Sequence, residues 1–173
     1  MIEVSRPGAE DSSWERFEAL YISARDDVYA YVASLLRDRA SAEDVTALAF
    51  ERAYRRRRTF DRRRGEERAW LFGIARNAAL DELRRRKRLA AFGDADLEAE
   101  RTEEVADVAL ARTMVRGAVA ALSARERELI ALKFYAGLSN AELARVLGVS
   151  ESNAGTILHR TIDKLRKACN ATV

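Results

Sequence analysis

The chain has 173 residues and a net charge of +3, with 48% hydrophobic and 34% charged residues, and its eight glycines and single proline leave few positions that would break a helix. One cysteine and one histidine exclude an internal disulfide and a Cys- or His-rich metal site, which fits a reducing cytoplasm. No signal-peptide pattern is found, and no apolar run approaches the roughly 20 residues that span a bilayer. The composition therefore predicts an all-helical, cytoplasmic protein without membrane insertion.

Charge is distributed in blocks along the chain. Eight arginines oppose one acid over Arg52–Arg64, and six basic residues oppose two acids over Arg76–Arg88. Over Asp94–Asp107, seven acids oppose one arginine. This order indicates two surfaces that bind polyanions, separated by a linker. Taken alone, the charge pattern is explained equally well by charged residues that only solvate the helices.

The first predicted helix starts near Ser12, which stands three residues before Glu15 with the spacing of a capping box. Its apolar residues recur at intervals of three and four and form one stripe that we expect to be core, namely Trp14, Phe17, Tyr21, Ala24, Val28, Tyr31 and Leu35. A second helix is predicted to begin at Ser41, with Asp44 three residues on, and to run into the first arginine block.

Residues 59–69 are polar and contain Gly65, which predicts a loop. A third helix is predicted over residues 70–88, with a buried face of Leu71, Ile74, Ala75 and Ala78. At roughly 100° per residue, one flank away from that face suits contacts with phosphates and carries Asn77, Asp81, Arg84 and Arg88. Trp70 and Tyr54, beside the loop, are expected to pack in the core rather than to stack on bases.

The acidic segment at 90–110 is poorly periodic, and we expect a flexible linker there between a domain at 12–89 and a second domain at 111–168. The second domain contains the strongest local motif, a helix-turn-helix over residues 139–160. Ser139 and Glu142 have capping-box spacing. Gly148 stands where the chain must turn, and Ser150 can cap the next helix. Apolar contacts between the two helices come from Leu143, Ala144, Leu147, Val149, Ala154 and Ile157.

The second helix of such a motif lies in the DNA major groove and reads bases with its first turns. Here the side chains expected to meet base edges are Ser152, Asn153, Thr156 and His159, and those expected to hold phosphates are Arg160, Lys164 and Lys167. The same helix–glycine–helix pattern also occurs in proteins that bind no DNA. His159 lacks partners for catalysis or metal binding, so we predict no catalytic residue, no metal site and no cofactor.

Three segments, in this order, resemble the extracytoplasmic-function (ECF) group of bacterial RNA polymerase sigma factors, which keep sigma domains 2 and 4 only. Residues 42–54 (AEDVTALAFERAY) resemble the domain 2 helix that docks on the polymerase. Residues 69–77 (AWLFGIARN), with Asp81 and the basic run at 84–88, resemble the −10 recognition helix. Residues 122–160, through LSARER, GLS, ELA, LGVS and LHR, resemble domain 4.

The resemblance covers roughly residues 12–168 and implies an alternative sigma factor rather than an enzyme. Such a factor binds the clamp helices and flap of core RNA polymerase, recognises the −35 and −10 promoter elements and promotes DNA melting. Domain 4 holds duplex DNA at −35, and domain 2 holds the non-template single strand at −10, where the loop at 59–69 takes up a base flipped out of the stack. An anti-sigma factor is the implied regulatory partner.

The resemblance carries three sets of site residues onto this sequence. The −10 set is Thr59, Phe60, Arg62, Arg63, Arg64, Arg76, Asn77, Asp81, Arg84, Arg85, Lys87 and Arg88. The −35 set is Ser152, Asn153, Thr156, His159, Arg160 and Lys164. The polymerase-binding set is Asp44, Thr46, Ala47, Phe50 and Glu51. The chain departs from the family pattern at Ala47 and Leu48, where a Gln-Glu-like polar pair is usual, and at Gly155 and Ile157, where a basic residue is frequent.

The main alternative is a helix-turn-helix transcriptional regulator whose N-terminal half senses a ligand or dimerises. It leaves both basic blocks without a role, and it predicts binding to duplex DNA without polymerase. An enzyme is disfavoured because the sequence has no Gly-rich phosphate loop and no histidine cluster. A purely structural helical adaptor would make the ordered domain 2 and domain 4 segments a coincidence.

Overall fold

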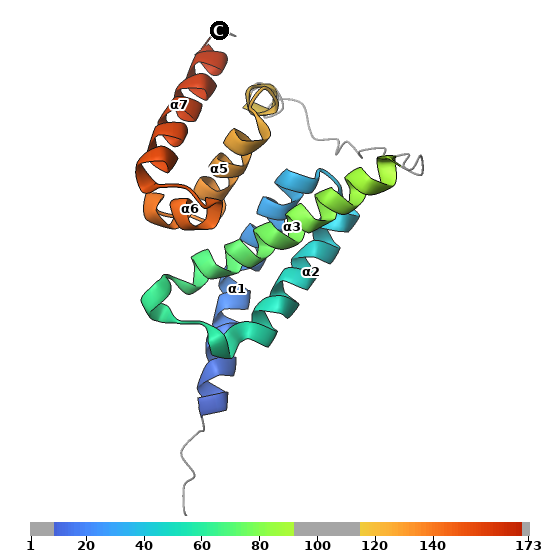
Figure 1. The fold of residues 1–173 in the computed structure, drawn as a ribbon, viewed down its shortest axis with the longest axis vertical. Helices are drawn as coiled ribbons and strands as arrows, with labels where there is room; N and C mark the ends of the chain where they lie inside the picture. The colour runs from blue at the N-terminus through green and yellow to red at the C-terminus, as the bar shows by residue number, and fades with distance from the viewer. Residues whose placement is uncertain (1–8, 92–114, 171–173) are drawn as a thin grey trace, which may run out of the picture.

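The computed structural model describes residues 9–91 and 115–170, and all regular elements within these ranges are helices. The all-helical prediction is therefore confirmed. Figure 1 shows a bundle of three long helices, followed by a smaller group of helices that ends at the C-terminus. Most of the expected linker lies outside the described residues, since only residues 90 and 91 are described and they belong to a helix.

The N-terminal bundle consists of α1 (Ala9–Leu36), α2 (Arg39–Arg56) and α3 (Glu67–Ala91), and each helix packs against the other two. Its largest buried side chains include Tyr31 of α1 and Phe72 of α3, whose ring centroids are 5.5 Å apart in an edge-to-face contact. The predicted buried face of α3 is confirmed for all four members, Leu71, Ile74, Ala75 and Ala78.

Each of the three helices begins before the residue predicted. α1 begins at Ala9, so Ser12 lies inside the helix and the predicted cap is wrong. α2 begins at Arg39 because Asp38, not Ser41, is its cap, and the Asp38 carboxylate accepts a hydrogen bond from Ser41 N at 2.9 Å. Hydrogen bonds from Ser41 lower the pKa of Asp38 below its ordinary value. α3 starts at Glu67, which shortens the predicted loop at its end.

The predicted core stripe of α1 is only partly correct. Trp14 is 47% exposed and Tyr21 is 39% exposed. Both rings pack edge-on against aromatic residues of α2, with centroids 5.8 Å apart for Trp14 and Tyr54 and 4.9 Å apart for Tyr21 and Phe50. Figure 1 shows that the first turns of α1 project beyond α2 and α3. The apolar periodicity of α1 therefore extends beyond the part of the helix that is packed in the core. The buried residues of the stripe are Phe17, Ala24, Val28 and Tyr31, and Leu35 is half-buried.

The C-terminal group contains a helical segment at 115–120, then α5 (Ala124–Phe134), α6 (Asn140–Leu147) and α7 (Glu151–Asn170). The predicted capping box at the start of α6 is confirmed. Ser139 N donates to Glu142 Oε2 at 2.8 Å, and Glu142 N donates back to Ser139 Oγ at 3.3 Å.

The turn of the helix-turn-helix also follows the prediction. Gly148 ends α6 with φ 67° and ψ 38°, the left-handed conformation that glycine adopts without strain. The cap on α7 is confirmed, because Ser150 Oγ accepts a hydrogen bond from Asn153 N at 3.2 Å. Ala154 is fully buried, and α6 and α7 pack on each other. The local sequence thus determines the position and orientation of α7.

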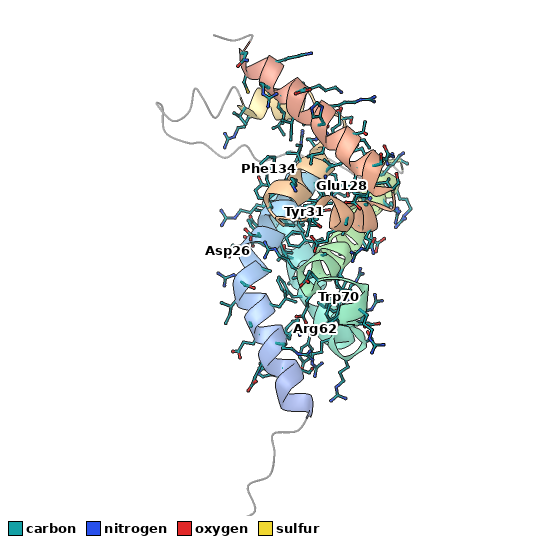
Figure 2. The ribbon with its side chains drawn as sticks, turned by 90° about the vertical axis from the view of Figure 1, so that its left-hand side faces the viewer. Asp26, Tyr31, Arg62, Trp70, Glu128 and Phe134 are labelled. Carbon is teal, nitrogen blue, oxygen red and sulfur yellow. The ribbon has the colours of Figure 1, made fainter. Side chains whose placement is uncertain are left out.

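The two groups of helices pack against each other, which the sequence did not predict. α5 lies against α1, α6 lies against α3, and buried apolar residues from both groups form one continuous cluster. Glu128 of α5 is at this junction, with only 8% of its surface exposed, next to Tyr31 of α1 (Figure 2). The structure thus brings together surfaces that the sequence placed in separate domains.

Candidate nucleic-acid interface

The segment between α2 and α3 is an ordered, arginine-rich loop. It contains two short 3₁₀ turns, Arg57–Thr59 and Arg62–Arg64. Asp61 caps the second turn by accepting a hydrogen bond from Arg63 N at 2.9 Å. The guanidinium of Arg57 lies over the Tyr54 ring, 3.8 Å from its centroid. The exposed members of the predicted −10 set in this loop are Thr59, Arg62 and Arg63, Phe60 is half-buried, and Arg64 lies in the second turn.

A cleft of about 440 Å³ opens between this loop and the first turns of α3. Phe60 and Trp70 contact each other on its wall, with ring centroids 5.3 Å apart and a tilt of 47°. Asn77 also lines it, and Arg62 lies near Trp70 at the same end of the bundle (Figure 2). Aromatic faces, an amide and nearby arginines are the groups that bind an unstacked base and its phosphates. Trp70 is half-buried, so it both packs on the core and faces this cleft.

The flank of α3 that was expected to meet DNA is exposed over its whole length. Asp81 accepts from Arg84 Nη1 at 3.1 Å and lies 3.6 Å from Arg52 Nη1 of α2. A single acid therefore orients two arginines on a basic surface. The exposed members of the predicted −10 set on α3 are Asn77, Asp81, Arg84, Arg85, Lys87 and Arg88.

Two further arginines of α3 point elsewhere. Arg86 is 13% exposed and donates to Leu36 O at 3.1 Å and to Asp38 at 3.0 Å, so it ties α3 to the turn between α1 and α2. Arg76 was predicted to bind the −10 strand, yet its Nε donates to Glu128 Oε1 at 2.6 Å and its side chain is 22% exposed. In this arrangement Arg76 is engaged inside the molecule and does not lie on the exposed flank.

The second helix of the helix-turn-helix, α7, presents its predicted base-reading face to solvent. Ser152, Asn153, Thr156, His159 and Arg160 are all exposed. The opposite face of α7 packs on the rest of the C-terminal group through buried side chains, including Leu158 and the fully buried Thr161.

Lys164, the last member of the predicted −35 set, is exposed and pairs with Glu126 of α5. Hydrogen bonds from Lys164 and from the capping residue Ser123 lower the pKa of Glu126 to about 2. The ion pair joins the C-terminal half of α7 to the first turn of α5.

A second hollow of about 780 Å³ lies between α1 and α2, away from the arginine-rich loop. Of the predicted polymerase-binding set, Thr46, Ala47 and Phe50 line it, while Asp44 and Glu51 are exposed on α2 outside its lining. The Thr46 hydroxyl is buried and has no hydrogen-bond partner among the described residues. The sequence analysis missed the α1 wall of this groove, which is made by Tyr21, Arg25, Asp26 and Tyr29.

Within residues 9–91 and 115–170, no three or more His, Cys, Asp or Glu side chains are grouped so that they could hold a metal ion. Over the same ranges, no helix combines the length and apolar character that crossing a lipid bilayer requires.

Comparison with known proteins identifies the family. Residues 20–89 match Sigma-70 region 2, and residues 112–165 match Sigma-70 region 4. The ECF RNA polymerase sigma factor SigL of Mycobacterium tuberculosis is 32% identical over 169 residues, covering 96% of this chain and 94% of SigL. The chain belongs to the ECF family of RNA polymerase sigma factors. It is therefore an alternative sigma factor that acts in transcription initiation.

Other sigma factors share the sequence or the fold. The ECF sigma factor SigX of Bacillus subtilis is 32% identical over 162 residues, covering 88% of this chain and 83% of SigX. The solved structure of RpoE from Bartonella quintana, in complex with the anti-sigma factor NepR, has a TM-score of 0.76 at 23% identity and covers 90% of this chain and 98% of RpoE. CnrH in complex with the cytosolic domain of CnrY has a TM-score of 0.64 at 24% identity, covering 92% and 91%. The fold of this sigma factor is thus the fold of those proteins.

Region 2 covers most of α1, all of α2, the arginine-rich loop and most of α3. The cleft beside the loop, the groove between α1 and α2 and the basic flank of α3 are therefore built largely from region 2. Region 4 covers α5, α6 and most of α7. Two residues that join these regions, Arg68 and Glu128, were missed by the sequence analysis. The one signal for Glu128 was its place directly before the apolar run Leu129–Leu132 of α5, since a carboxylate that becomes buried there needs a partner. Nothing local pointed to Arg68.

Proposed function

We propose that this sigma factor binds core RNA polymerase, holds the −35 element with a domain 4 at 111–168, and captures the −10 non-template strand with a domain 2 at 12–89. The observation that carries the −10 assignment is the cleft in which Phe60, Trp70 and Asn77 lie beside an arginine-rich loop. Stacking on an aromatic side chain is worth about 1–3 kcal/mol per base, comparable with the few kcal/mol that unstacking the base costs. DNA melting would thus be driven by binding energy.

The −35 assignment rests on the exposed face of α7. Asn153 and His159 lie on that face with unobstructed access to solvent, next to Arg160 for the phosphate backbone. A helix held by a preceding short helix and a glycine turn is the arrangement that enters the major groove. Amide and imidazole groups there can read base edges, and basic residues beside them add sequence-independent affinity.

The groove between α1 and α2 is the proposed polymerase-binding surface. It offers aromatic side chains from both helices, and docking of another protein there would cover Tyr21, Tyr29 and Phe50. Partly exposed aromatics at a concave surface are typical of protein interfaces. The buried and unpartnered Thr46 hydroxyl is a further reason, because a docked polar group could satisfy it.

An anti-sigma factor is the regulatory partner that we propose. The support is the fold, which is that of RpoE bound to NepR and of CnrH bound to CnrY. A sigma factor works on polymerase and promoter DNA, so the proposed location is the cytoplasm. We also propose that the chain contributes binding energy only, without catalysis of its own.

In vitro transcription tests the proposal directly. Purified core polymerase, this protein and a genomic fragment library should yield RNA 5′ ends at discrete start sites, each preceded by paired motifs near −35 and −10. Failure to bind core polymerase, together with tight binding of the free chain to duplex DNA, would instead support the helix-turn-helix regulator. Start sites that do not depend on the added protein would also contradict the proposal.

Charge reversal on α3 separates strand capture from polymerase binding. Arg84→Glu with Arg88→Glu should abolish promoter opening, measured by permanganate reactivity, while gel filtration still shows the complex with core polymerase. The reason is that both side chains lie on the exposed flank and touch no part of the α1–α2 groove. The matched control is Arg16→Glu with Arg116→Glu, which changes the net charge equally at exposed positions elsewhere. Loss of polymerase binding by the α3 variant would refute this division of labour.

Substitutions on α7 test base reading at −35. Asn153→Ala or His159→Ala should weaken recognition by about tenfold or more at the base pair that each side chain contacts. Lys167→Ala, at the end of the helix, should weaken all sequences about equally, as loss of a phosphate contact does. If transcription from promoters with single −35 base changes responds to the Asn153 and His159 variants as it does to the wild type, the recognition face is wrong.

A further inference from the structure

A third hollow, lined by arginines, lies where the two groups of helices pack together, and the proposed function gives it no ligand. Its volume is about 450 Å³, within the range of about 300–1,000 Å³ that small-molecule sites occupy. Residues of α1, α3 and α5 line it, together with Gly148 and Val149 in the turn between α6 and α7. Glu128, labelled in Figure 2, belongs to the same lining. The hollow therefore has the size of a site for a small molecule.

The charge of this hollow is strongly positive. Its lining contains four arginines, Arg37, Arg76, Arg125 and Arg127, and a single acid, Glu128. Arg76 engages that acid, since its Nε donates to Glu128 Oε1 at 2.6 Å and its Nη2 donates to Oε2 at 3.4 Å. The charges of the other three arginines thus have no counter-charge within the lining. A concave surface with charges of one sign attracts an ion of the opposite sign, here an anion.

Two of these guanidinium groups are available to a ligand. Over the ranges that the structure describes, the side chains of Arg37 and Arg125 make no hydrogen bond and no ion pair, and both residues are exposed. Arg127 donates from Nη1 to Ala120 O at 3.1 Å and to Leu122 O at 3.0 Å, which orients its guanidinium at the start of α5. Arginine binds phosphate through two parallel hydrogen bonds from a planar fork. Three such groups around one hollow suit a ligand with more than one phosphate.

The backbone of Arg37 indicates that its side chain has a use. Arg37 directly follows α1, and its N donates to Ala33 O at 2.9 Å, which closes the helix. Its φ of 53° lies in the left-handed region, and no other non-glycine residue within 9–91 and 115–170 has a positive φ. Glycine adopts this conformation without strain, so an arginine here is held at a cost in stability. Residues strained in this way concentrate at functional sites.

The remaining walls of the hollow are largely apolar. Five apolar side chains contribute to them and are only partly buried in the chain, namely Leu35, Leu80, Leu83, Leu147 and Val149. Such a surface can cover a flat heterocyclic ring. A ligand that matches the whole lining has phosphates for the arginines and a flat, weakly polar group for the leucines, and a nucleotide combines these two parts.

We propose that this hollow binds a nucleotide, with the phosphates on Arg37, Arg125 and Arg127 and the base against the leucines. The nucleotide is an effector and not a substrate. The only acid of the lining is engaged by Arg76, and the lining contains no histidine or cysteine that could serve as a base or nucleophile. This inference goes beyond the proposed function, which concerns polymerase and promoter DNA alone.

Binding of mant-ATP and mant-GTP to the full chain, followed by fluorescence anisotropy, tests the proposal. The wild type should bind at least one of the two saturably, unlabelled nucleotide should displace it, and the melting temperature should rise with nucleotide concentration. Arg37→Gly is the most informative variant, because glycine relieves the strained backbone while the side chain is lost. Its affinity should fall about tenfold or more, whereas its melting temperature without nucleotide should stay equal or rise. Arg125→Ala should weaken binding to a similar extent.

Arg16→Ala is the matched control, since it removes the same charge from an exposed position of α1 outside the hollow. Its affinity for nucleotide should equal that of the wild type. Unchanged affinity in both Arg37→Gly and Arg125→Ala would overturn the proposal. Absence of saturable binding of either nucleotide by the wild type, up to about 1 mM, would overturn it as well, because ordinary metabolite sites bind more tightly than that.

Two further probes separate a nucleotide from other polyanions. Inorganic triphosphate has no base to place on the leucines and should bind about tenfold more weakly than ATP or GTP; equal affinity would overturn the assignment to a nucleotide. A −35 duplex is the second probe. If Arg37→Gly and Arg125→Ala weaken its binding while neither nucleotide binds, the arginines belong to the DNA surface and the proposal fails. All of these outcomes are independent of the in vitro transcription test, so failure of this inference leaves the proposed function intact.

Discussion

The glycine inside α7, the proposed recognition helix, gives a stability prediction whose sign the structure determines. Gly155 lies in the second turn of α7, and a Cβ added there would meet only Asn140 Nδ2 at 3.6 Å, which is ordinary van der Waals contact. Alanine is about 1 kcal/mol more favourable than glycine in a helix interior. Gly155→Ala should therefore raise the free energy of unfolding by about 0.5–1 kcal/mol.

The matched control is Gly148→Ala, which adds the same methyl group at the preceding turn. No atom lies within 4 Å of a Cβ built there, so sterics with neighbours contribute nothing. The backbone, however, has φ 67°, and the left-handed conformation costs a residue with a Cβ about 1–2 kcal/mol. Gly148→Ala should thus lower the free energy of unfolding by about 1 kcal/mol.

Urea titrations followed by circular dichroism measure the free energy of unfolding of both variants. A change in the unfolding midpoint, at an unchanged dependence of that free energy on urea concentration, reports the change in stability. Two changes of opposite sign are expected for one and the same chemical substitution. A decrease for Gly155→Ala would refute the reasoning, because it would mean that the space beside α7 is filled or that the helix is distorted at this position. The recognition helix should also become stiffer, so affinity for −35 DNA should stay equal or rise.

Two further predictions concern caps and charges in region 4. Ser139→Ala removes one half of the capping box with Glu142 and should lower the free energy of unfolding by about 1 kcal/mol in the same titration; a change within error would mean that the box adds little. Because the pKa of Glu126 is depressed from 4.5 to about 2, its pairing with Lys164 stabilises the fold above about pH 4.5 and is lost as the pH falls towards 2. Melting temperatures measured across this range should fall less steeply for Glu126→Gln than for the wild type, and identical slopes would contradict the assignment.

Local sequence signals predicted the parts of this fold that local physics determines. Ser139, Glu142 and Gly148 were assigned correctly because capping boxes and left-handed glycines depend on a few neighbouring residues. The exposed flank of α3 was predicted because helical periodicity alone separates it from the buried face. The predicted helix starts in the N-terminal bundle were wrong, since Asp38 and Ser41 are both good caps and the choice between them depends on the turn that precedes α2.

The misassigned residues have long-range causes. Tyr21 follows the same periodicity as the core residues of α1, yet its ring packs on Phe50 of α2 at the groove and 39% of its surface stays exposed. Arg76 falls within a basic run that suggests DNA, yet its partner Glu128 is 52 residues away in the sequence. No periodicity or spacing within one helix encodes such a pairing, so tertiary structure was needed to see it.

The contact between the two groups of helices engages the two proposed DNA-binding surfaces unequally, and this leads to one more prediction. It engages Arg76 and narrows the −10 cleft, whereas Asn153 and His159 of α7 remain exposed. Glu128→Gln should therefore raise the affinity of the free chain for the −10 strand and leave its affinity for −35 duplex unchanged within about twofold, since no base-reading side chain changes its surroundings. Both affinities can be measured by fluorescence anisotropy on one protein preparation. An equal rise in both would mean that the variant alters region 4 itself, and would refute this reasoning.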